Sequence, residues 1–435
     1  MSSNYDALKG ELEKMGVQMP SFHDIVFLCG KNGPVENVEN IIRALKAKNL
    51  TRYDSFTSSY QIQDNGVWVS YEDQYHATEW QCKLSEEFDF LIRVSKDKVH
   101  NALVAIAHQN TIDTARDYVQ QLVWDKKPRL DTWLSTVYGV EQNEYHQSIG
   151  SNWIKGMVSR MVYPGCKFDY ALLVYGPQGY KKSTSLLYIS SEPWHAEVNA
   201  EIRDKEFYQI LQGRTLVEFS EGATLRKTDQ DRIKSIITAT QDVFRPSYGK
   251  VAKSHARRCV FALTTNNDEI LKDVTGNRRW WPVTVKKVAD VEWIKENRDQ
   301  MMAEAYYRIT ELKEDTYTIP EKEAQDAQNA FRVHEPNEDL YLAWYDTLTD
   351  EQKSNGISIR QAYTGALVNN KLGDLVVDIP KAAEMSVSRI LKGTLLLTKS
   401  DNVIRRGTER VYLYYPPVVP VTEEDDLITH AVKGF

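Results

Sequence analysis

The hydrophobic pattern of the first quarter of the chain changes period twice. Residues 37–48 (NVENIIRALKAK) and 98–107 carry apolar side chains at helical spacing, and residues 5–15 fit a short helix. Between these helices, residues 51–68 are rich in aromatic and β-branched side chains around an Asp-Asn-Gly turn, which predicts a small β unit. We therefore expect an N-terminal α+β module over residues 1–110.

Helical periodicity continues up to the middle of the chain and is then replaced by an alternation of strands and helices. Residues 114–140 predict two helices separated at Lys127-Pro128, and residues 147–162 predict another, so a helical bundle is expected over residues 111–165. Apolar strands are then expected at 172–175, 213–221 and 259–267, with helices at 183–189 and 229–239. Because strands alternate with helices, the pattern predicts an α/β core over residues 166–320.

The last hundred residues have a third pattern. After helices at 291–312 and 321–333, residues 339–347, 358–368 and 382–392 predict three short helices, and strands at 394–399 and 409–415 flank a basic turn. Three helices followed by a basic hairpin are typical of a winged-helix domain, expected over residues 335–418. Its DNA contacts would be Arg389, Arg405 and Arg406. The alternative is a helical lid that binds no nucleic acid, and residues 419–435 form an acidic tail.

Composition narrows the class of protein. The chain has 435 residues, of which 42% are hydrophobic and 26% charged, which is typical of a soluble globular protein with roughly two to four domains. No apolar run is long enough to span a membrane and no signal peptide is recognisable, so we expect a cytoplasmic protein. Its four cysteines are scattered singly, which indicates neither a zinc site nor disulfides. The net charge of −7 argues against a globally basic nucleic-acid coat.

The segment 171–190 (ALLVYGPQGYKKSTSLLYIS) is predicted to be a phosphate-binding loop between a strand and a helix. The template G-x-x-x-x-G-K-[ST] fits Gly176, Lys182 and Ser183, but Lys181 stands at the second glycine. Lys182 would neutralise the β/γ-phosphates, and Ser183 would ligate Mg²⁺. The alternative is a lysine-rich helix N-terminus after a turn. The expected ATP contacts are Gly176, Pro177, Gln178, Gly179, Tyr180, Lys181, Lys182, Ser183 and Thr184.

Two later strands are predicted to deliver polar groups to this loop. GRTLVEFSE carries Glu218 and ends at Glu221, and we expect Glu218 to face the metal and Glu221 to activate water. The strand CVFALTTNN ends in an amide pair, and Asn266 or Asn267 would hold the attacking water or the γ-phosphate. Surface glutamates and plain turn chemistry are the alternatives.

Two basic segments complete the candidate chemistry. Residues 245–258 (RPSYGKVAKSHARR) suit a hairpin that contacts DNA phosphates, and the alternative is a solvated charged loop. The motif TGNRRWWP presents Arg278 and Arg279, one of which could reach a neighbouring subunit as an arginine finger. The residues that give the first segment its basic character are Arg245, Lys250, Lys253, His255, Arg257 and Arg258, and we expect the first four to bind DNA.

From about residue 37 to 285, the chain resembles the virulence-associated protein E family of phages, satellites and mobile islands. The resemblance rests on RDYVQQLVWDKKPRLDTWL, GPQGYKKST, GRTLVEFSE, IKSIITATQDVFRPSYG and CVFALTTNNDEILKDVTGNRRWWPV in this order. These proteins are P-loop ATPases similar to superfamily 3 hexameric helicases, so the resemblance implies an AAA+-like core sheet flanked by helices. Lys181 departs from the family, which has glycine at that position.

The resemblance also implies ATP-driven translocation of a ring, most often hexameric, on single-stranded DNA. Lys182 and Ser183 then take the phosphate and Mg²⁺ roles, and Asn266 is the sensor. Glu218 and Glu221 form the acidic strand, and Arg278 or Arg279 is the finger. Residues 245–255 correspond to the DNA-gripping hairpin, the winged helix would contact origin duplex DNA, and priming would fall to a partner protein.

Two other functions are compatible with the same sequence. Lys181 suggests an ATP-binding assembly protein that does not unwind DNA. The C-terminal domain suggests a DNA-binding regulator with a vestigial nucleotide fold. ATP turnover stimulated by DNA would separate a helicase or initiator ATPase from both.

Overall fold

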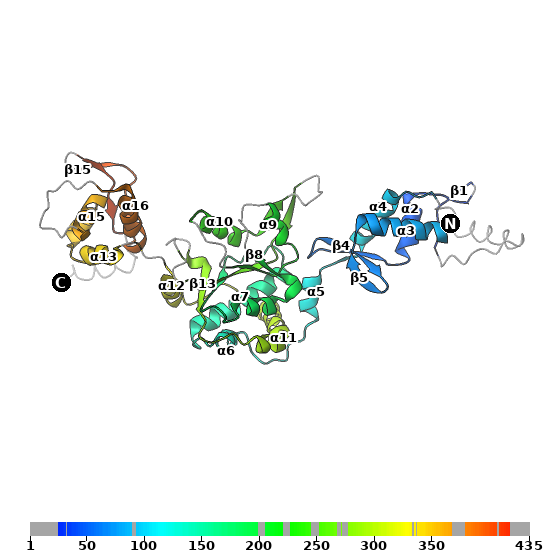
Figure 1. Cartoon of the computed structure of the whole chain (residues 1–435), viewed down its shortest axis with the longest axis horizontal. Coiled ribbons are helices and arrows are strands. Elements are labelled where there is room, and N and C mark those ends of the chain that lie inside the picture. Colours follow the sequence, from blue (N-terminus) through cyan, green and yellow to red (C-terminus); the bar gives the residue numbers. More distant parts are fainter. Residues whose placement is uncertain are drawn as a thin grey trace, which may run out of the picture.

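The computed structural model describes residues 25–31, 33–88, 93–198, 205–220, 227–244, 252–267, 271, 277–332, 335, 337–367, 379–406 and 409–417. The helix predicted over residues 5–15 and the acidic tail lie outside these residues. The described elements form an N-terminal part, a central part and a C-terminal part, which follow one another along the longest axis of the molecule (Figure 1). None of the described helices is both long and apolar enough to cross a membrane.

The N-terminal part is a small sheet packed against helices. Its strands have the order β5-β4-β3-β6, and their bounds are β3 (Thr51–Asp54), β4 (Ser59–Asp64), β5 (Val67–Ser70) and β6 (Thr111–Ile112). The helices are α2 (Val38–Lys46), α3 (Asp73–Glu87) and α4 (Lys96–Gln109). A separate core of buried side chains, which includes Ile41, Leu84 and Leu103, holds the three helices together. Sequence analysis predicted α2, α4 and a β unit over residues 51–68, which contains β3 and β4, but it did not predict α3 or β6.

The central part is built on a five-stranded sheet whose strands are all parallel. The order is β13-β7-β12-β9-β8. The bounds are β7 (Ala171–Tyr175), β8 (His195–Val198), β9 (Leu216–Phe219), β12 (Val260–Thr265) and β13 (Trp280–Thr284). The first strand in sequence therefore lies between the last two, and the sheet is the parallel α/β core that the sequence predicts. Ligands of such sheets bind outside the carboxyl ends of the strands.

Helices cover both faces of this sheet because successive residues of its strands point to opposite sides. Leu172 and Val174 pack in one buried core with α7 (Glu144–Val162), α8 (Lys182–Ser190) and α11 (Val291–Thr310). Ala171 and Leu173 pack in the other, with α9 (Lys205–Ile210) and α10 (Lys227–Thr238). The strands are apolar on both faces, as expected of a sheet buried between two helical layers.

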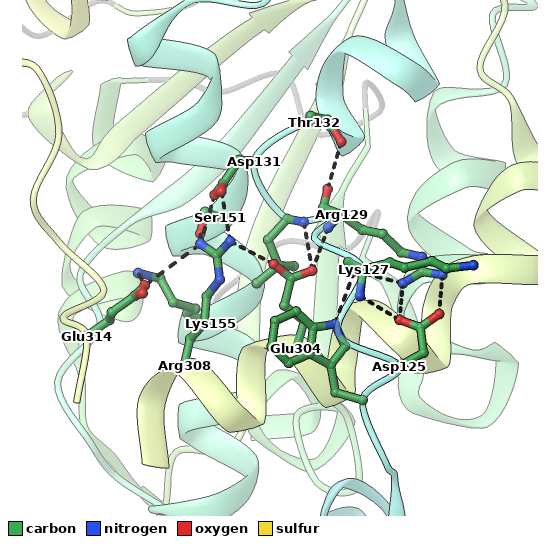
Figure 2. A network of polar contacts seen from close by, with 12 residues as sticks. Asp125, Lys127, Arg129, Asp131, Thr132, Ser151, Lys155, Glu304, Arg308 and Glu314 are labelled. Atoms are coloured by element: carbon green, nitrogen blue, oxygen red, sulfur yellow. Dashed lines mark hydrogen bonds and ion pairs between the residues drawn. The ribbon is translucent and has the colours of Figure 1, made fainter. Parts of the chain in front are cut away.

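An irregular segment of residues 122–132 joins α5 (Thr114–Gln121) to α6 (Trp133–Tyr138) and is attached to α11 by an ion pair and by hydrogen bonds (Figure 2). The buried Glu304 carboxylate accepts hydrogen bonds from the backbone N–H groups of Arg129 (2.6 Å) and Leu130 (3.2 Å). Arg308 pairs with Glu304 at 2.7 Å and donates to both oxygens of Asp131. The Glu304 carboxylate thus accepts hydrogen bonds from two backbone N–H groups that lie outside any helix or sheet.

The C-terminal part has its own buried core, which contains Tyr341, Ile357 and Ile390. Three of its helices are α13 (Glu338–Asp346), α15 (Ile359–Leu367) and α16 (Lys381–Arg389), with the short α14 (Asp350–Ser354) after α13. Ile357 bridges to Tyr414, and β14 (Thr398–Lys399) pairs with β17 (Tyr414–Tyr415). Between these strands, β15 (Ile404–Arg406) and β16 (Glu409–Val411) form an antiparallel hairpin. The order of elements matches the sequence-based expectation of helices followed by a basic hairpin.

Candidate nucleotide and DNA site

The loop between β7 and α8 leaves the carboxyl end of a central strand of the sheet. Lys181, which caps α8, has φ 55° and ψ 33°, in the left-handed region that favours glycine. This backbone conformation explains why glycine suits the position in the sequence template. A lysine there costs about 1 kcal/mol of backbone strain, and Lys182 begins the helix in the expected register.

The Lys182 side chain is only 9% exposed and lies inside the loop. Its ammonium group donates hydrogen bonds to the carbonyl oxygens of Gly176 (2.7 Å) and Pro177 (3.0 Å). It also donates to Oδ1 of Asn266 at 2.7 Å. The ammonium therefore lies between the loop and the end of the neighbouring strand β12. Of the two candidate amides, Asn266 is the one that reaches the lysine, whereas Asn267 makes backbone contacts with Thr265.

A row of hydroxyl and carboxylate groups runs from the start of α8 into the sheet. The Ser183 hydroxyl lies 3.4 Å from that of Thr264, and Thr264 donates to Oε1 of Glu218 at 2.6 Å. Oε2 of Glu218 lies 3.2 Å from Nε2 of His195, and the Glu218 side chain is fully buried. The Thr264 hydroxyl thus stands between Glu218 and Ser183, so the Glu218 carboxylate contacts the loop through Thr264.

Lys182, Ser183, Thr264 and Asn266 border one cavity of about 770 Å³. The loop contributes residues 178–184, and the facing wall includes Ser220, Thr264 and Asn266. Among the described residues that line the cavity, the one carboxylate is Glu197, in β8 beside Glu218. Sequence analysis missed Glu197 because His195–Val198 is a short edge strand with little hydrophobic signal. Glu221 lies outside the described residues.

The chemistry of this wall fits a magnesium nucleotide. Backbone N–H groups at a helix N-terminus and a lysine ammonium suit phosphate oxygens. Hydroxyl and carboxylate oxygens, such as those of Ser183 and Glu197, suit Mg²⁺, which keeps several of its waters. Within the described residues, no group of three or more His, Cys, Asp and Glu side chains could hold a metal alone. A magnesium ion here would therefore need the phosphates as further ligands.

The first turn of α8 is held in place by hydrogen bonds of the Ser185 hydroxyl. Ser185 donates to the Lys182 carbonyl oxygen at 2.5 Å, and its hydroxyl lies 2.7 Å from that of Tyr138. Burial raises the pKa of the Tyr138 phenol well above its ordinary value of 10.0, so the phenol stays neutral. This packing fixes the first turn of α8 against α6.

Arg278 and Arg279 lie at the amino ends of the sheet strands, whereas the loop leaves the carboxyl end of β7. They belong to a short turn of helix (Asn277–Arg279) directly before β13, which runs parallel to β7 with Trp280 beside Ala171. The loop follows the other end of β7, and a five-residue strand separates the two edges by about 13 Å. Neither arginine is therefore placed to serve the loop of its own subunit.

The basic segment after α10 includes an antiparallel hairpin of β10 (Gln241–Phe244) and β11 (Lys253–Ala256). Lys253 is exposed, and the His255 ring stacks on Phe244 with ring centroids 4.5 Å apart. Burial, followed by the nearby Lys253, lowers the pKa of His255 below its ordinary value of 6.5. Arg245 and Lys250 lie outside the described residues.

Two arginines of this basic segment are used inside the protein. Arg257 binds Asp242 through two hydrogen bonds of 2.7 and 2.5 Å, and Arg258 binds Asp113 through two of 2.7 and 2.6 Å. Their charges are neutralised, so they do not add to the charge of the hairpin. If both arginines are counted with the exposed basic residues, as the sequence alone suggests, the positive charge of the hairpin is overestimated.

The three arginines expected to bind DNA in the C-terminal part differ in their contacts. Arg389, at the end of α16, pairs with Glu335 at 2.6 Å. Arg406 donates to the Gly356 carbonyl oxygen (3.0 Å) and to Gln361 (2.9 Å). Arg405 is exposed on the β15–β16 hairpin opposite Arg410. Arg405 and Arg410 therefore place positive charge at the same position of the hairpin.

Comparisons with known proteins agree with this architecture. A search of curated proteins finds no match. The chain is similar in structure to the apo structure of the NrS-1 C-terminal region, with a TM-score of 0.52 and 12% sequence identity, covering 88% of this chain and 100% of that one. The A form apo structure of that region gives a TM-score of 0.51 at 12% identity and covers 87% and 99%. At this identity, the likeness shows the fold alone.

A family model matches the sequence directly. The virulence-associated protein E-like domain matches residues 119–335, which span α6 to α12 (Glu321–Asn329) and contain the loop, the parallel sheet and both basic segments of the central part. Through these residues, the chain belongs to the virulence-associated protein E-like family.

Proposed function

We propose that the chain is an ATP-dependent replication protein of a phage or mobile genetic element, acting as a DNA helicase or initiator ATPase. The observation that carries the proposal is the convergence of the loop, Lys182 and Asn266 on one cavity at the carboxyl end of β7. Family membership supports the same reading. The phosphate-loop fold and the ATP site are parts of this proposal.

In this proposal, Lys182 exchanges its contacts with the Gly176 and Pro177 carbonyl oxygens for the β/γ-phosphates. Asn266 stays beside the ammonium and senses the γ-phosphate. Ser183 holds Mg²⁺, which would neutralise charge on the triphosphate. Glu218 orients the Thr264 hydroxyl next to Ser183, and Glu221 is the proposed base for the attacking water.

The DNA contacts and the assembly are further parts of the proposal. Lys253 and His255, with Arg245 and Lys250, would contact single-stranded DNA phosphates from the hairpin. The C-terminal part would contact duplex DNA as a winged helix through Arg389, Arg405 and Arg406. Subunits would form a ring, most simply a hexamer, because Arg278 and Arg279 lie on the edge of the sheet away from their own loop. A separate primase would supply primers.

The test is ATP turnover by the full chain with and without single-stranded DNA. A helicase or initiator hydrolyses ATP, and DNA stimulates the rate several-fold. ATP binding with turnover that DNA does not change would overturn the proposal. Such a result would favour an ATP-binding assembly protein, an alternative that the strained backbone of Lys181 supports.

A further inference from the structure

A second cavity, of about 720 Å³, lies where the central and C-terminal parts meet. Tyr170, Asn277 and Arg278 line it from the amino edge of the sheet, where β7 and β13 begin. Residues 317–319 and α12 (Glu321–Asn329) form a second wall, and Gly393, Thr394 and Leu396 of the C-terminal part contribute a third. The cavity is therefore separate from the loop site, which lies at the other edge of the sheet.

In the part of the lining that the structure describes, one available cation is combined with two aromatic rings. Arg278 is exposed, and within the described residues no carboxylate pairs with it. Tyr170 is held in place because its ring stacks on Trp281, with centroids 4.4 Å apart and planes at 17°. Tyr317 is 62% exposed, and Gln325 and Asn329 are exposed amides of α12. These are the groups that bind a base by stacking and a phosphate by charge.

The wall of the C-terminal part is fixed by a buried ion pair. Arg332 pairs with Glu338 at 2.7 Å, and the Thr394 hydroxyl donates to the same carboxylate oxygen at 2.5 Å. Because Glu338 neutralises Arg332, Arg278 is the cation that remains for an anion among the described lining residues. Glu321 is the opposing charge on the wall.

We propose that this junction cavity binds a nucleotide unit, with its base on Tyr170 and Tyr317 and its phosphate at Arg278. The volume lies within the range of ligand pockets, roughly 300–1,000 Å³, and such pockets are common where domains meet. Stacking on tyrosine tolerates any base, and the amides can bond base edges. The unit belongs either to a free nucleotide or to single-stranded DNA. The proposal does not depend on ATP hydrolysis at the loop.

The test is photo-crosslinking of the full chain without ATP, using iododeoxyuridine monophosphate and, separately, a short thymidine oligonucleotide that carries iododeoxyuridine. Mass spectrometry should find the label on Tyr317 or Tyr170. Arg278→Gln should reduce this labelling about tenfold, the order expected when a hydrogen bond between charged groups is lost. Arg93→Gln, which removes an exposed arginine of the N-terminal part, is the matched control and should change nothing.

The two probes identify the source of the unit. Labelling by the monophosphate indicates a free nucleotide, whereas labelling by the oligonucleotide alone indicates a unit of a DNA strand. Absence of label from both tyrosines with both probes would overturn the proposal. Labelling that Arg278→Gln leaves unchanged would do the same. Isothermal titration with each probe, comparing Tyr317→Ala with Tyr317→Phe, should show weaker binding only for the alanine variant, because phenylalanine keeps the stacking surface.

Discussion

The Lys182 ammonium lies 2.7 Å from the Asn266 amide oxygen, although 84 residues separate them in the chain. This hydrogen bond joins the loop after β7 to the end of β12, the next strand in the sheet. A phosphate that binds the lysine would therefore also meet the amide. If the loop binds a nucleotide, the contact would link that binding to the strand that follows the basic hairpin.

Lys182→Ala should abolish ATP hydrolysis, because the Lys182 ammonium lies inside the loop between the Gly176 carbonyl oxygen and Asn266, where a phosphate would bind. Lys181→Ala is the matched control and should keep most of the turnover. Steady-state phosphate release measures both variants. The opposite pattern, with Lys181 essential and Lys182 dispensable, would show that the register of the loop is wrong.

Lys181→Gly should stabilise the protein by about 1 kcal/mol while hydrolysis is kept or raised, because glycine adopts φ 55° without strain. Lys126→Gly is the control for the backbone effect alone, because Lys126 has a similar φ of 64° in the irregular segment away from the loop. Both variants should shift the urea midpoint upward. A fall in stability for Lys181→Gly would contradict the assignment of strain to this residue.

The next prediction concerns how DNA binding by the β10–β11 hairpin depends on salt. Replacing Lys250, Lys253 and His255 with alanine should spare basal hydrolysis but remove its stimulation by single-stranded DNA. Each lost lysine–phosphate contact should reduce the slope of log affinity against log salt by about 0.7. Fluorescence anisotropy with labelled DNA gives the slope. Lys46→Ala is the control, because Lys46 is an exposed lysine of α2 in the N-terminal part.

His255 should behave differently from the lysines of this hairpin. Because its pKa is lowered below 6.5, His255 is neutral at pH 7, and His255→Ala should leave the salt slope unchanged there. As the pH falls through this lowered pKa the ring gains a proton, so DNA affinity of the unaltered protein should rise more steeply than that of the variant. Equal pH profiles would exclude His255 from the contact.

If Arg278 or Arg279 completes the site of a neighbouring subunit, two inactive variants should complement each other. Replacing Arg278 or Arg279 with alanine should leave ATP binding intact and, for the residue that reaches the neighbour, stop hydrolysis. Mixing this protein with Lys182→Ala should restore some turnover, because an interface then pairs an intact loop with an intact arginine. A mixture that stays inactive, while light scattering shows normal assembly, would support salt bridges within each subunit instead.

Glu304→Ala should destabilise the central part by about 3 kcal/mol, because the backbone N–H groups of Arg129 and Leu130 lose their acceptor. Burial raises the pKa of Glu304 above 4.5, so the folded state holds the proton more tightly than the unfolded state. Its contribution to stability is therefore largest below pH 4.5 and falls as pH rises. Urea unfolding at several pH values measures this, with the exposed Glu296→Ala as control.

Much of the fold follows from local pattern, and the missing elements have physical reasons. The apolar strands β7, β9 and β12 were predicted because burial on both faces makes them continuously hydrophobic. β13 was not, because Pro282 cannot donate a hydrogen bond and argues against a strand. The structure accommodates it at an edge of the sheet, where proline is tolerated.

The candidate site is predictable only where a motif is contiguous in sequence. The loop residues follow from a template, and so does the register that begins α8 at Lys182. The contact of Glu218 with His195 depends on β8 pairing with β9, which no local pattern specifies. The neutralisation of Arg258 by Asp113 depends on a distant helix start in the same way. Long-range pairing therefore decides which charged residues remain available for ligands.

Asp113 has a practical consequence for dissecting the protein. It accepts a hydrogen bond from the backbone N–H of Arg116 at the start of α5 and also binds Arg258, and Phe56 of the N-terminal part is buried in the central core. The family match begins only at residue 119. A fragment cut there would expose apolar surface and leave Arg258 with a buried, unpaired charge. Soluble fragments for crystallisation or screening should therefore start upstream of the sheet that carries Phe56.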